Sequence, residues 1–148
     1  MTSFFPDLNV WIALSVAGHV HSGEAWSWLR VLPAGSRLIF CRYTQVGLLR
    51  LLTNESAMGM QTLTLQRAWE VYDQWLNDPR VEFHPEPRGL DTSFRRMTSP
   101  FSRQHASNRI GDCYLLAYAS ESDAPLVTFD RALLAFARKR GYSAILPG

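Results

Sequence analysis

The alternation of short apolar runs with amphipathic stretches predicts strands and helices in turn along the chain. The apolar runs that predict strands are Phe4–Phe5, Ser36–Phe40, Arg80–His84, Pro125–Phe129 and Ser143–Leu146. Residues 62–77 carry apolar side chains three and four positions apart, the pattern of an amphipathic helix. Short apolar strands separated by helices indicate a parallel sheet covered on both faces, so the predicted fold class is α/β.

The segments between the strands predict helices. They cover residues 9–16, a segment from Ser22 (with Ser22 as its cap), then 42–54, 62–77, 88–97, 111–121 and 130–140, with a polar loop at 98–108. The sequence shows no internal repeat, low-complexity tract or linker. At 148 residues the chain is long enough for one domain with a core and short for two, so we expect a single domain over residues 1–148.

Composition adds limits on location and partners. The hydrophobic fraction of 47% is that of a globular protein, and a net charge of +2 is too small for a dedicated DNA-coating protein. Cys41 and Cys113 lack CxxC spacing, which favours buried thiols over a metal site or a disulfide. Without a secretory signal pattern or an apolar run of about 18 residues, the chain is expected to be cytoplasmic and not bound to membranes.

Charge placement singles out three aspartates. Asp7 lies in an apolar run, where an uncompensated carboxylate costs several kcal/mol, and its nearest basic residue in sequence is Arg30. Asp130 follows the fourth predicted strand, and Asp112 opens the helix before that strand. Because reactive groups of parallel sheets gather beyond the carboxyl ends of the strands, we expect the three carboxylates to converge.

Converging carboxylates repel by roughly 4 kcal/mol per pair at about 4 Å and an effective dielectric near 20. A proton or a divalent cation relieves this repulsion, and carboxylate oxygens suit Mg²⁺ or Mn²⁺. An aspartate at a helix start is often only an N-cap, which is the simpler interpretation of Asp112 or Asp130 alone. Taken with Asp7, the set instead predicts a metal site able to act on a phosphodiester.

Three motifs carry a resemblance to a known family. The segments "PDLNVWIAL", "GDCYLLAYA" and "LVTFDRAL" resemble the acidic motifs of PIN-domain ribonucleases, and of VapC-type toxins of toxin–antitoxin pairs in particular. "TQVGLLRLLTN" is similar to a phrase of one subgroup of those toxins. The resemblance implies a five-stranded parallel sheet between helices, Mg²⁺- or Mn²⁺-dependent cleavage of RNA, and neutralisation by a cognate antitoxin protein.

Carried over to these motifs, the resemblance implies that Asp7 and Asp112 are the principal metal ligands. Asp130 would bind a second ion or orient a water. The family's glutamate after the second strand is missing: Gln45 stands in that region, and its amide oxygen can only accept a hydrogen bond from a metal-bound water. Glu86 is a candidate substitute.

Further residues are expected to support the site. Thr128 could hydrogen-bond a carboxylate, Arg50 could contact a phosphate or pair with an acid, and Asn9 is expected to cap the first helix, with water binding as the alternative. Arginines with aromatic residues around 94–109 suit single-stranded RNA. Apolar surface on the helix of Trp26 and Trp28 would form a homodimer or antitoxin interface.

The prediction is a metal-dependent endoribonuclease. A receiver or phosphotransfer domain fits less well, because position 9 is Asn rather than an acid and Lys139 lies within a helix. The second alternative, made credible by Gln45, is a non-catalytic PIN-like module that binds RNA or protein.

Overall fold

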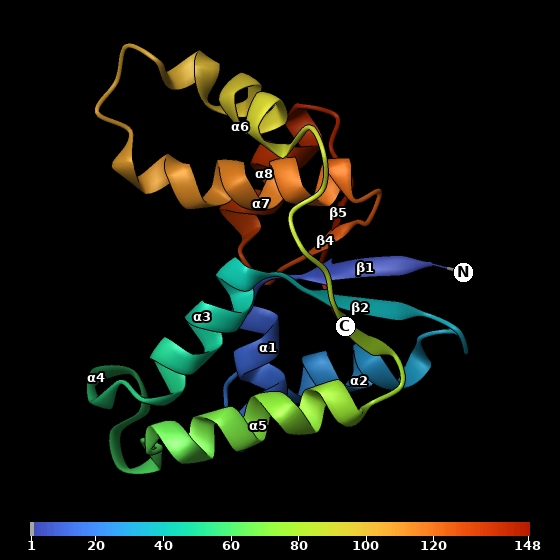
Figure 1. The fold of residues 1–148 in the computed structure, drawn as a ribbon, viewed down its shortest axis with the longest axis vertical. Coiled ribbons are helices and arrows are strands. Elements are labelled where there is room, and N and C mark those ends of the chain that lie inside the picture. Colours follow the sequence, from blue (N-terminus) through green and yellow to red (C-terminus); the bar gives the residue numbers. More distant parts are fainter. Residues whose placement is uncertain (1) are drawn as a thin grey trace.

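A five-stranded parallel sheet forms the centre of the molecule (Figure 1), as the pattern of short apolar runs predicts. The computed structural model describes residues 2–148. The strands lie in the order β3–β2–β1–β4–β5, with bounds β1 Ser3–Pro6, β2 Arg37–Phe40, β3 Val81–Phe83, β4 Leu126–Val127 and β5 Ala144–Ile145. Strand β1 is central and the chain order reverses beside it, so the turns after β1 and β4 are neighbours at one sheet edge.

Helices cover both faces of this sheet. Their bounds are α1 Leu8–Ser15, α2 Ser22–Val31, α3 Arg42–Leu52, α4 Glu55–Met58, α5 Leu65–Asn77, α6 Leu90–Thr98, α7 Ile110–Glu121 and α8 Arg131–Lys139. Helices α1, α2, α3 and α5 lie on one side, while α6, α7 and α8 lie on the other (Figure 1). In the described part of the chain, no helix is both long and apolar enough to cross a membrane.

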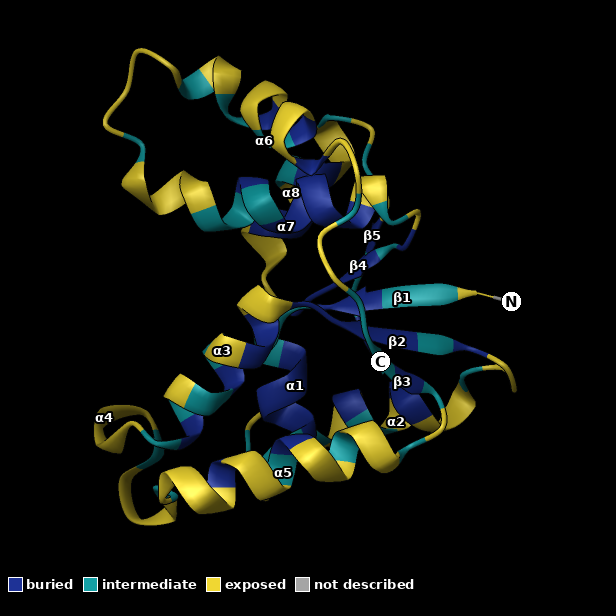
Figure 2. Ribbon diagram, in the orientation of Figure 1, coloured by how far each residue is buried: buried dark blue, intermediate teal, exposed yellow. Residues whose placement is uncertain are grey.

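Strand side chains alternate between two apolar cores, one on each face of the sheet. Leu38 and Phe40 pack with the core of α1, α2, α3 and α5, whereas Ile39 between them packs with that of α6, α7 and α8. Figure 2 shows the buried residues concentrated in the strands and on the helix surfaces that face them. Cys41 and Cys113 are both buried free thiols, as predicted.

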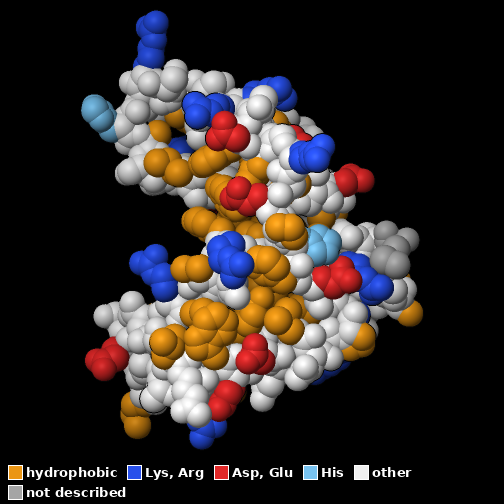
Figure 3. Space-filling view, viewed as in Figure 1, with side chains coloured by type: hydrophobic (Ala, Val, Ile, Leu, Met, Phe, Trp, Pro, Cys, Tyr) orange, Lys and Arg blue, Asp and Glu red, His pale blue; other side chains and the backbone are white. Residues whose placement is uncertain are grey.

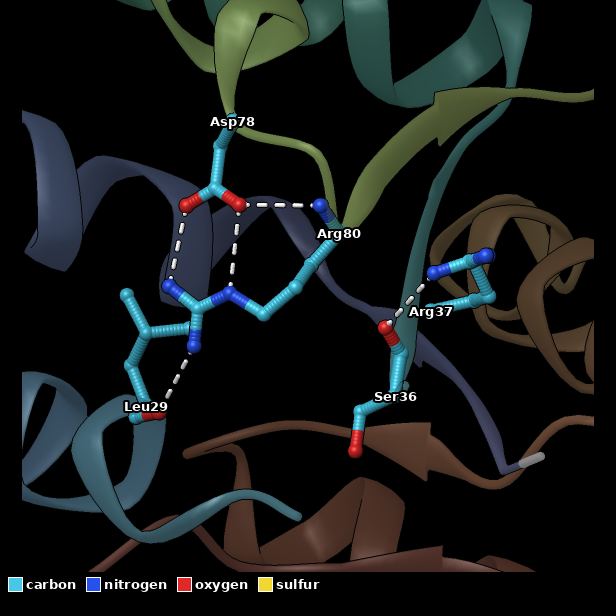
Figure 4. A network of polar contacts seen from close by, with 5 residues as sticks. All are labelled: Leu29, Ser36, Arg37, Asp78 and Arg80. Carbon is cyan, nitrogen blue, oxygen red and sulfur yellow. Dashed lines mark hydrogen bonds and ion pairs between the residues drawn. The ribbon is translucent and has the colours of Figure 1, made fainter. Parts of the chain in front are cut away.

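A polar network anchors the start of β3 to α2 (Figure 4). The Arg80 guanidinium donates Nε–H to Asp78 Oδ1 at 3.1 Å and an Nη2–H to Asp78 Oδ2 at 2.9 Å, and its Nη1 donates to the Leu29 carbonyl at 3.1 Å. These bonds to the Arg80 side chain hold the pKa of Asp78 below its usual value. They fix the edge strand against the helix layer.

Local differences from the sequence prediction concern caps and short helices. Ser22 is the first residue of α2 rather than its cap, and His21 at the N-cap position makes no side-chain capping bond. The expected loop at 98–108 contains two 3₁₀ turns, Ser99–Phe101 and Ser107–Arg109. Helix α4 is an element that the apolar pattern missed, because none of its residues is buried.

Candidate active site

Asp7 lies directly after β1, at the N-cap position of α1, and both of its carboxylate oxygens are held. Oδ1 accepts a hydrogen bond from the Leu8 backbone N–H at 2.6 Å, and Oδ2 accepts one from the Thr128 hydroxyl at 2.8 Å. Each oxygen keeps a further lone pair. The carboxylate is therefore oriented by the protein while remaining able to accept another ligand.

Thr128 is the centre of the hydrogen-bond network that orients Asp7. Its side chain is fully buried, and its hydroxyl accepts from the Asn9 amide at 3.1 Å and from the Asp130 backbone N–H at 3.1 Å. With the bond to Asp7, the hydroxyl uses its one donor and both acceptors. The expectation that Thr128 bonds a carboxylate is confirmed.

Asn9 links the two segments that carry the acids. Its amide donates to Thr128, and its Oδ1 accepts from the Phe129 backbone N–H at 3.2 Å. The expectation that Asn9 caps the first helix is wrong, because Asp7 occupies the capping position and Asn9 reaches instead across to the turn after β4. Asn9 thus positions Thr128 and, through it, Asp7.

Asp112 and Asp130 stand on helices at the same edge of the sheet. Asp112 lies in the first turn of α7, and Asp130 is the N-cap of α8, where its Oδ1 accepts from the Leu133 N–H at 3.1 Å. The simpler interpretation, an N-cap, thus holds for Asp130 but not for Asp112, since α7 has Arg109 at its N-cap position. The other carboxylate oxygen of Asp130, Oδ2, takes no part in this capping bond.

The three carboxylates influence one another electrostatically. Burial raises the pKa of Asp7 above its usual value, and the negative charges of Asp112 and Asp130 raise it further. Burial and the charge of Asp130 likewise raise the pKa of Asp112, while the Arg109 guanidinium opposes this. None of the ion pairs formed within residues 2–148 includes any of the three aspartates.

The donor set fits a hard divalent cation held by few protein ligands. In the described part of the chain, no three or more His, Cys, Asp or Glu side chains are grouped closely enough to hold an ion. An ion at this edge would take fewer than three of these carboxylates directly and complete its shell with water and substrate oxygens, as Mg²⁺ commonly does. The oriented Asp7 carboxylate, with no basic partner, suits that role.

Gln45 and Glu86 are each engaged by another side chain. Gln45 is buried on α3, where its Oε1 accepts from an Arg42 Nη at 2.6 Å, so that oxygen is already engaged. Glu86 instead accepts a hydrogen bond from the Tyr114 hydroxyl at 3.2 Å.

Tyr43 is a residue of the site that sequence reasoning missed. Burial raises the pKa of its phenol, and the charges of Asp7 and Asp112 raise it further. The Tyr43 hydroxyl lies close to Gly111, the residue before Asp112: a Cβ on that glycine would be 2.7 Å from it. Tyr43 stacks on Tyr114, with ring centroids 5.0 Å apart. Its position, three residues beyond the predicted end of a strand in a parallel sheet, was the available signal.

The sequence matches a known protein family: the model of the PIN domain matches residues 4–139. This chain belongs to the PIN-domain family. Ribonuclease VapC41 of Mycobacterium tuberculosis is 39% identical over 131 residues, which cover 85% of this chain and 88% of that protein. Ribonuclease VapC39 of the same organism is 28% identical over 136 residues, covering 86% and 88% respectively. The resemblance to VapC-type PIN ribonucleases is therefore confirmed.

Solved PIN structures share the fold. VapBC2 from Rickettsia felis, bound to a DNA fragment from its promoter, aligns with a TM-score of 0.71 at 12% identity, over 99% of this chain and 100% of that chain. VapC20 of Mycobacterium tuberculosis, described as a Sarcin-Ricin loop cleaving toxin, aligns with a TM-score of 0.67 at 15% identity, over 96% and 98%. At these identities the likeness concerns the PIN fold, which this chain shows over its whole length.

Proposed function

We propose that this PIN-domain protein is a metal-dependent endoribonuclease and the toxin of a toxin–antitoxin pair. The relatives named as ribonucleases support the activity, and the VapBC complexes among the structural neighbours support the pairing with an antitoxin. The observation that carries the proposal is the Asp7 carboxylate, which is held at both oxygens and has no basic partner among the described residues; burial raises its pKa, and the charges of two further aspartates add to this.

Each acid has a role in this proposal. Asp7 and Asp112 would hold Mg²⁺ or Mn²⁺, and Asp130, through the oxygen that does not cap α8, would orient a water for in-line attack on the RNA phosphodiester. When bound, the ion supplies Lewis acidity towards the phosphate and the attacking water. Thr128 keeps Asp7 in one orientation, and Asn9 holds Thr128. Gln45 is outside this set, because Arg42 engages its amide oxygen.

A second group of residues would bind RNA on the α6–α7 side of the acids. The Arg109 guanidinium lies 5.2 Å from the centre of the Phe101 ring and 5.8 Å from that of Phe136. The surrounding groove, of about 730 Å³, is also lined by Arg95 and His105. Arginine beside exposed aromatic surface is suited to phosphates and unpaired bases of a single strand.

A nuclease assay on RNA with added Mn²⁺ tests the proposal. The wild-type protein should cleave internally, and both a chelator and Asp7→Asn should abolish cleavage, while Asp73→Asn on the exposed face of α5 serves as the matched control. Cleavage that survives the chelator and Asp7→Asn would overturn the proposed mechanism. Metal-independent RNA binding without any cleavage would instead favour the non-catalytic PIN-like module.

We also propose that the protein forms a homodimer through the exposed face of α5. Trp28 is buried and Trp26 packs against Trp75, so these two side chains do not supply an exposed apolar interface. Leu65 and Trp69 on α5 remain 58% and 42% exposed. A homodimer burying them should become monomeric by light scattering when both are changed to serine; an unchanged mass would reject this face.

A further inference from the structure

A groove of about 580 Å³ lies between α3 and α7. Leu8, the residue after Asp7, lines it, and so does Tyr114, one half-turn beyond Asp112 on α7. Figure 3 shows the surface hollowed between the part of the molecule formed by α3 to α5 and the part formed by α6 and α7. The groove is thus lined by close sequence neighbours of two of the proposed catalytic acids, and it shares no lining residue with the arginine-lined groove around Arg109.

Tyr43 forms a braced aromatic surface at the entrance to this groove. Its ring stacks on Tyr114 with a 31° interplanar angle, and Tyr114 in turn contacts the edge of Phe94 at 5.7 Å. Tyr43 nevertheless stays 46% exposed. A Cβ at Gly111 would lie 2.7 Å from the Tyr43 hydroxyl, so the glycine is what lets the ring lie against α7. The result is a fixed ring with open surface beside the acids.

Glu86 and Arg50 bring opposite charges to the same groove. The Tyr114 hydroxyl donates to Glu86 Oε1 at 3.2 Å, which orients the carboxylate while leaving Oε2 free. Arg50 is exposed and forms no ion pair with the residues that the structure describes.

We propose that this groove is a nucleotide subsite for single-stranded RNA, in which the base beside the scissile phosphodiester stacks on Tyr43, Glu86 accepts hydrogen bonds from its edge, and Arg50 contacts a neighbouring phosphate. Unpaired bases are recognised by stacking on aromatic rings and by hydrogen bonds along their Watson–Crick edges. A carboxylate only accepts, and guanine is the base that offers two adjacent N–H donors there. The subsite therefore selects guanine. This inference rests on the proposed ribonuclease function.

Cleavage of short single-stranded RNA of random sequence, with the new ends sequenced, tests the selectivity. Wild-type protein with Mn²⁺ should cut next to guanine, and Glu86→Gln should lose that preference while still cutting. Tyr43→Ala should raise KM by roughly 5- to 150-fold, the range that corresponds to stacking of one base, with kcat changed less. Tyr43→Phe keeps the ring and should restore the wild-type KM.

Glu70→Gln, an exposed carboxylate on α5, is the matched control for Glu86→Gln, as Tyr43→Phe is for Tyr43→Ala. An unchanged KM in Tyr43→Ala, or an unchanged guanine preference in Glu86→Gln, would overturn the subsite. So would loss of antitoxin binding in Tyr43→Ala with RNA affinity intact, because the groove would then be a protein interface.

Fluorescence anisotropy of labelled RNA with Asp112→Asn protein separates this inference from the proposed function. Guanine-selective binding that depends on Tyr43 supports the subsite even if the wild-type protein cleaves nothing, in which case only the nuclease function fails. Binding without base preference, alongside cleavage by the wild type, would reject the subsite and leave the nuclease function standing.

Discussion

Replacing Thr128 with valine should separate the positioning of Asp7 from the packing of the core. Valine keeps the shape of the buried side chain but removes the hydroxyl that bonds Asp7 at 2.8 Å, the Asn9 amide at 3.1 Å and the Asp130 N–H at 3.1 Å. A neutral hydrogen bond contributes about 1 kcal/mol net, and one to a charged group about 1.5–3 kcal/mol. The free energy of unfolding should therefore fall by about 3.5–5 kcal/mol, which for a domain of this size lowers Tm by roughly 7–20 °C.

The functional consequence of Thr128→Val is distinct from this loss of stability. The hydroxyl lowers the pKa of Asp7, so its removal leaves a proton to compete more strongly with a cation for the carboxylate. Loss of such an orienting partner typically weakens metal affinity about 10- to 100-fold. Titration calorimetry with Mn²⁺, at a temperature where the variant is folded, measures this directly. Thr128→Ser, which keeps the hydroxyl, is the control. If valine and serine variants bind Mn²⁺ equally, the reasoning about Asp7 is refuted.

Two further predictions concern charge and stability. In metal-free protein, Asp7→Asn should raise the free energy of unfolding at pH 7, because burial raises the pKa of Asp7 in the folded state and the native state is therefore destabilised as pH rises through that value. The gain should vanish as pH falls towards 3.8 in urea denaturation, and a pH-independent gain would contradict it. For Asp78 the sign is opposite: its pKa is lowered by Arg80, so its contribution is present above pH 3.8 and lost as pH falls through the lowered pKa. Asp78→Asn should lower the free energy of unfolding at pH 7 and change it little in strong acid. Urea denaturation over the same pH series measures this, and an equal loss at every pH would contradict it.

The fold was largely predictable because its determinants are local. Each strand is a short apolar run, and the residues of β2 alternate between two cores as period-two burial requires. Strand bounds were less predictable: the segment expected at 125–129 is strand only at Leu126–Val127. The hydroxyl of Thr128, next in the chain, accepts a hydrogen bond from the Asp130 backbone N–H. Apolar periodicity does not reveal such a contact.

The three aspartates could be singled out from the sequence, and so could the bond from Thr128 to a carboxylate, but the contacts of Asn9 and Tyr43 could not. Asp7, Asp112 and Asp130 stood out because few structural roles account for three charged side chains near the ends of parallel strands. Asparagine and threonine are common near strand ends, where they cap helices or favour extended backbone. The bond between Asn9 and Thr128 joins residues 119 positions apart, and only the folded chain brings them together. Tyr43 was missed for the same reason: an aromatic side chain after a strand usually packs in the core, and its approach to Gly111 and Tyr114 of α7 exists only in the folded chain.

In the proposed metal-dependent enzyme, the same repulsion that makes the acidic edge unfavourable would favour the binding of a cation. Were the three carboxylates neutralised by ion pairs, a metal ion would have to displace those partners before binding. Here Arg109 lowers the pKa of Asp112 without forming an ion pair within 4 Å, so the net effect of the surroundings on Asp7 and Asp112 remains a raised pKa. A divalent cation then removes a destabilising repulsion as it binds, and it should stabilise the fold by about 2.7 kcal/mol at a concentration 100 times its Kd. Hydrogen bonds from Thr128 and Leu8 fix the direction of the Asp7 oxygens. A cation would therefore be held at a defined position beside Asp7, and not merely attracted to a region of negative charge.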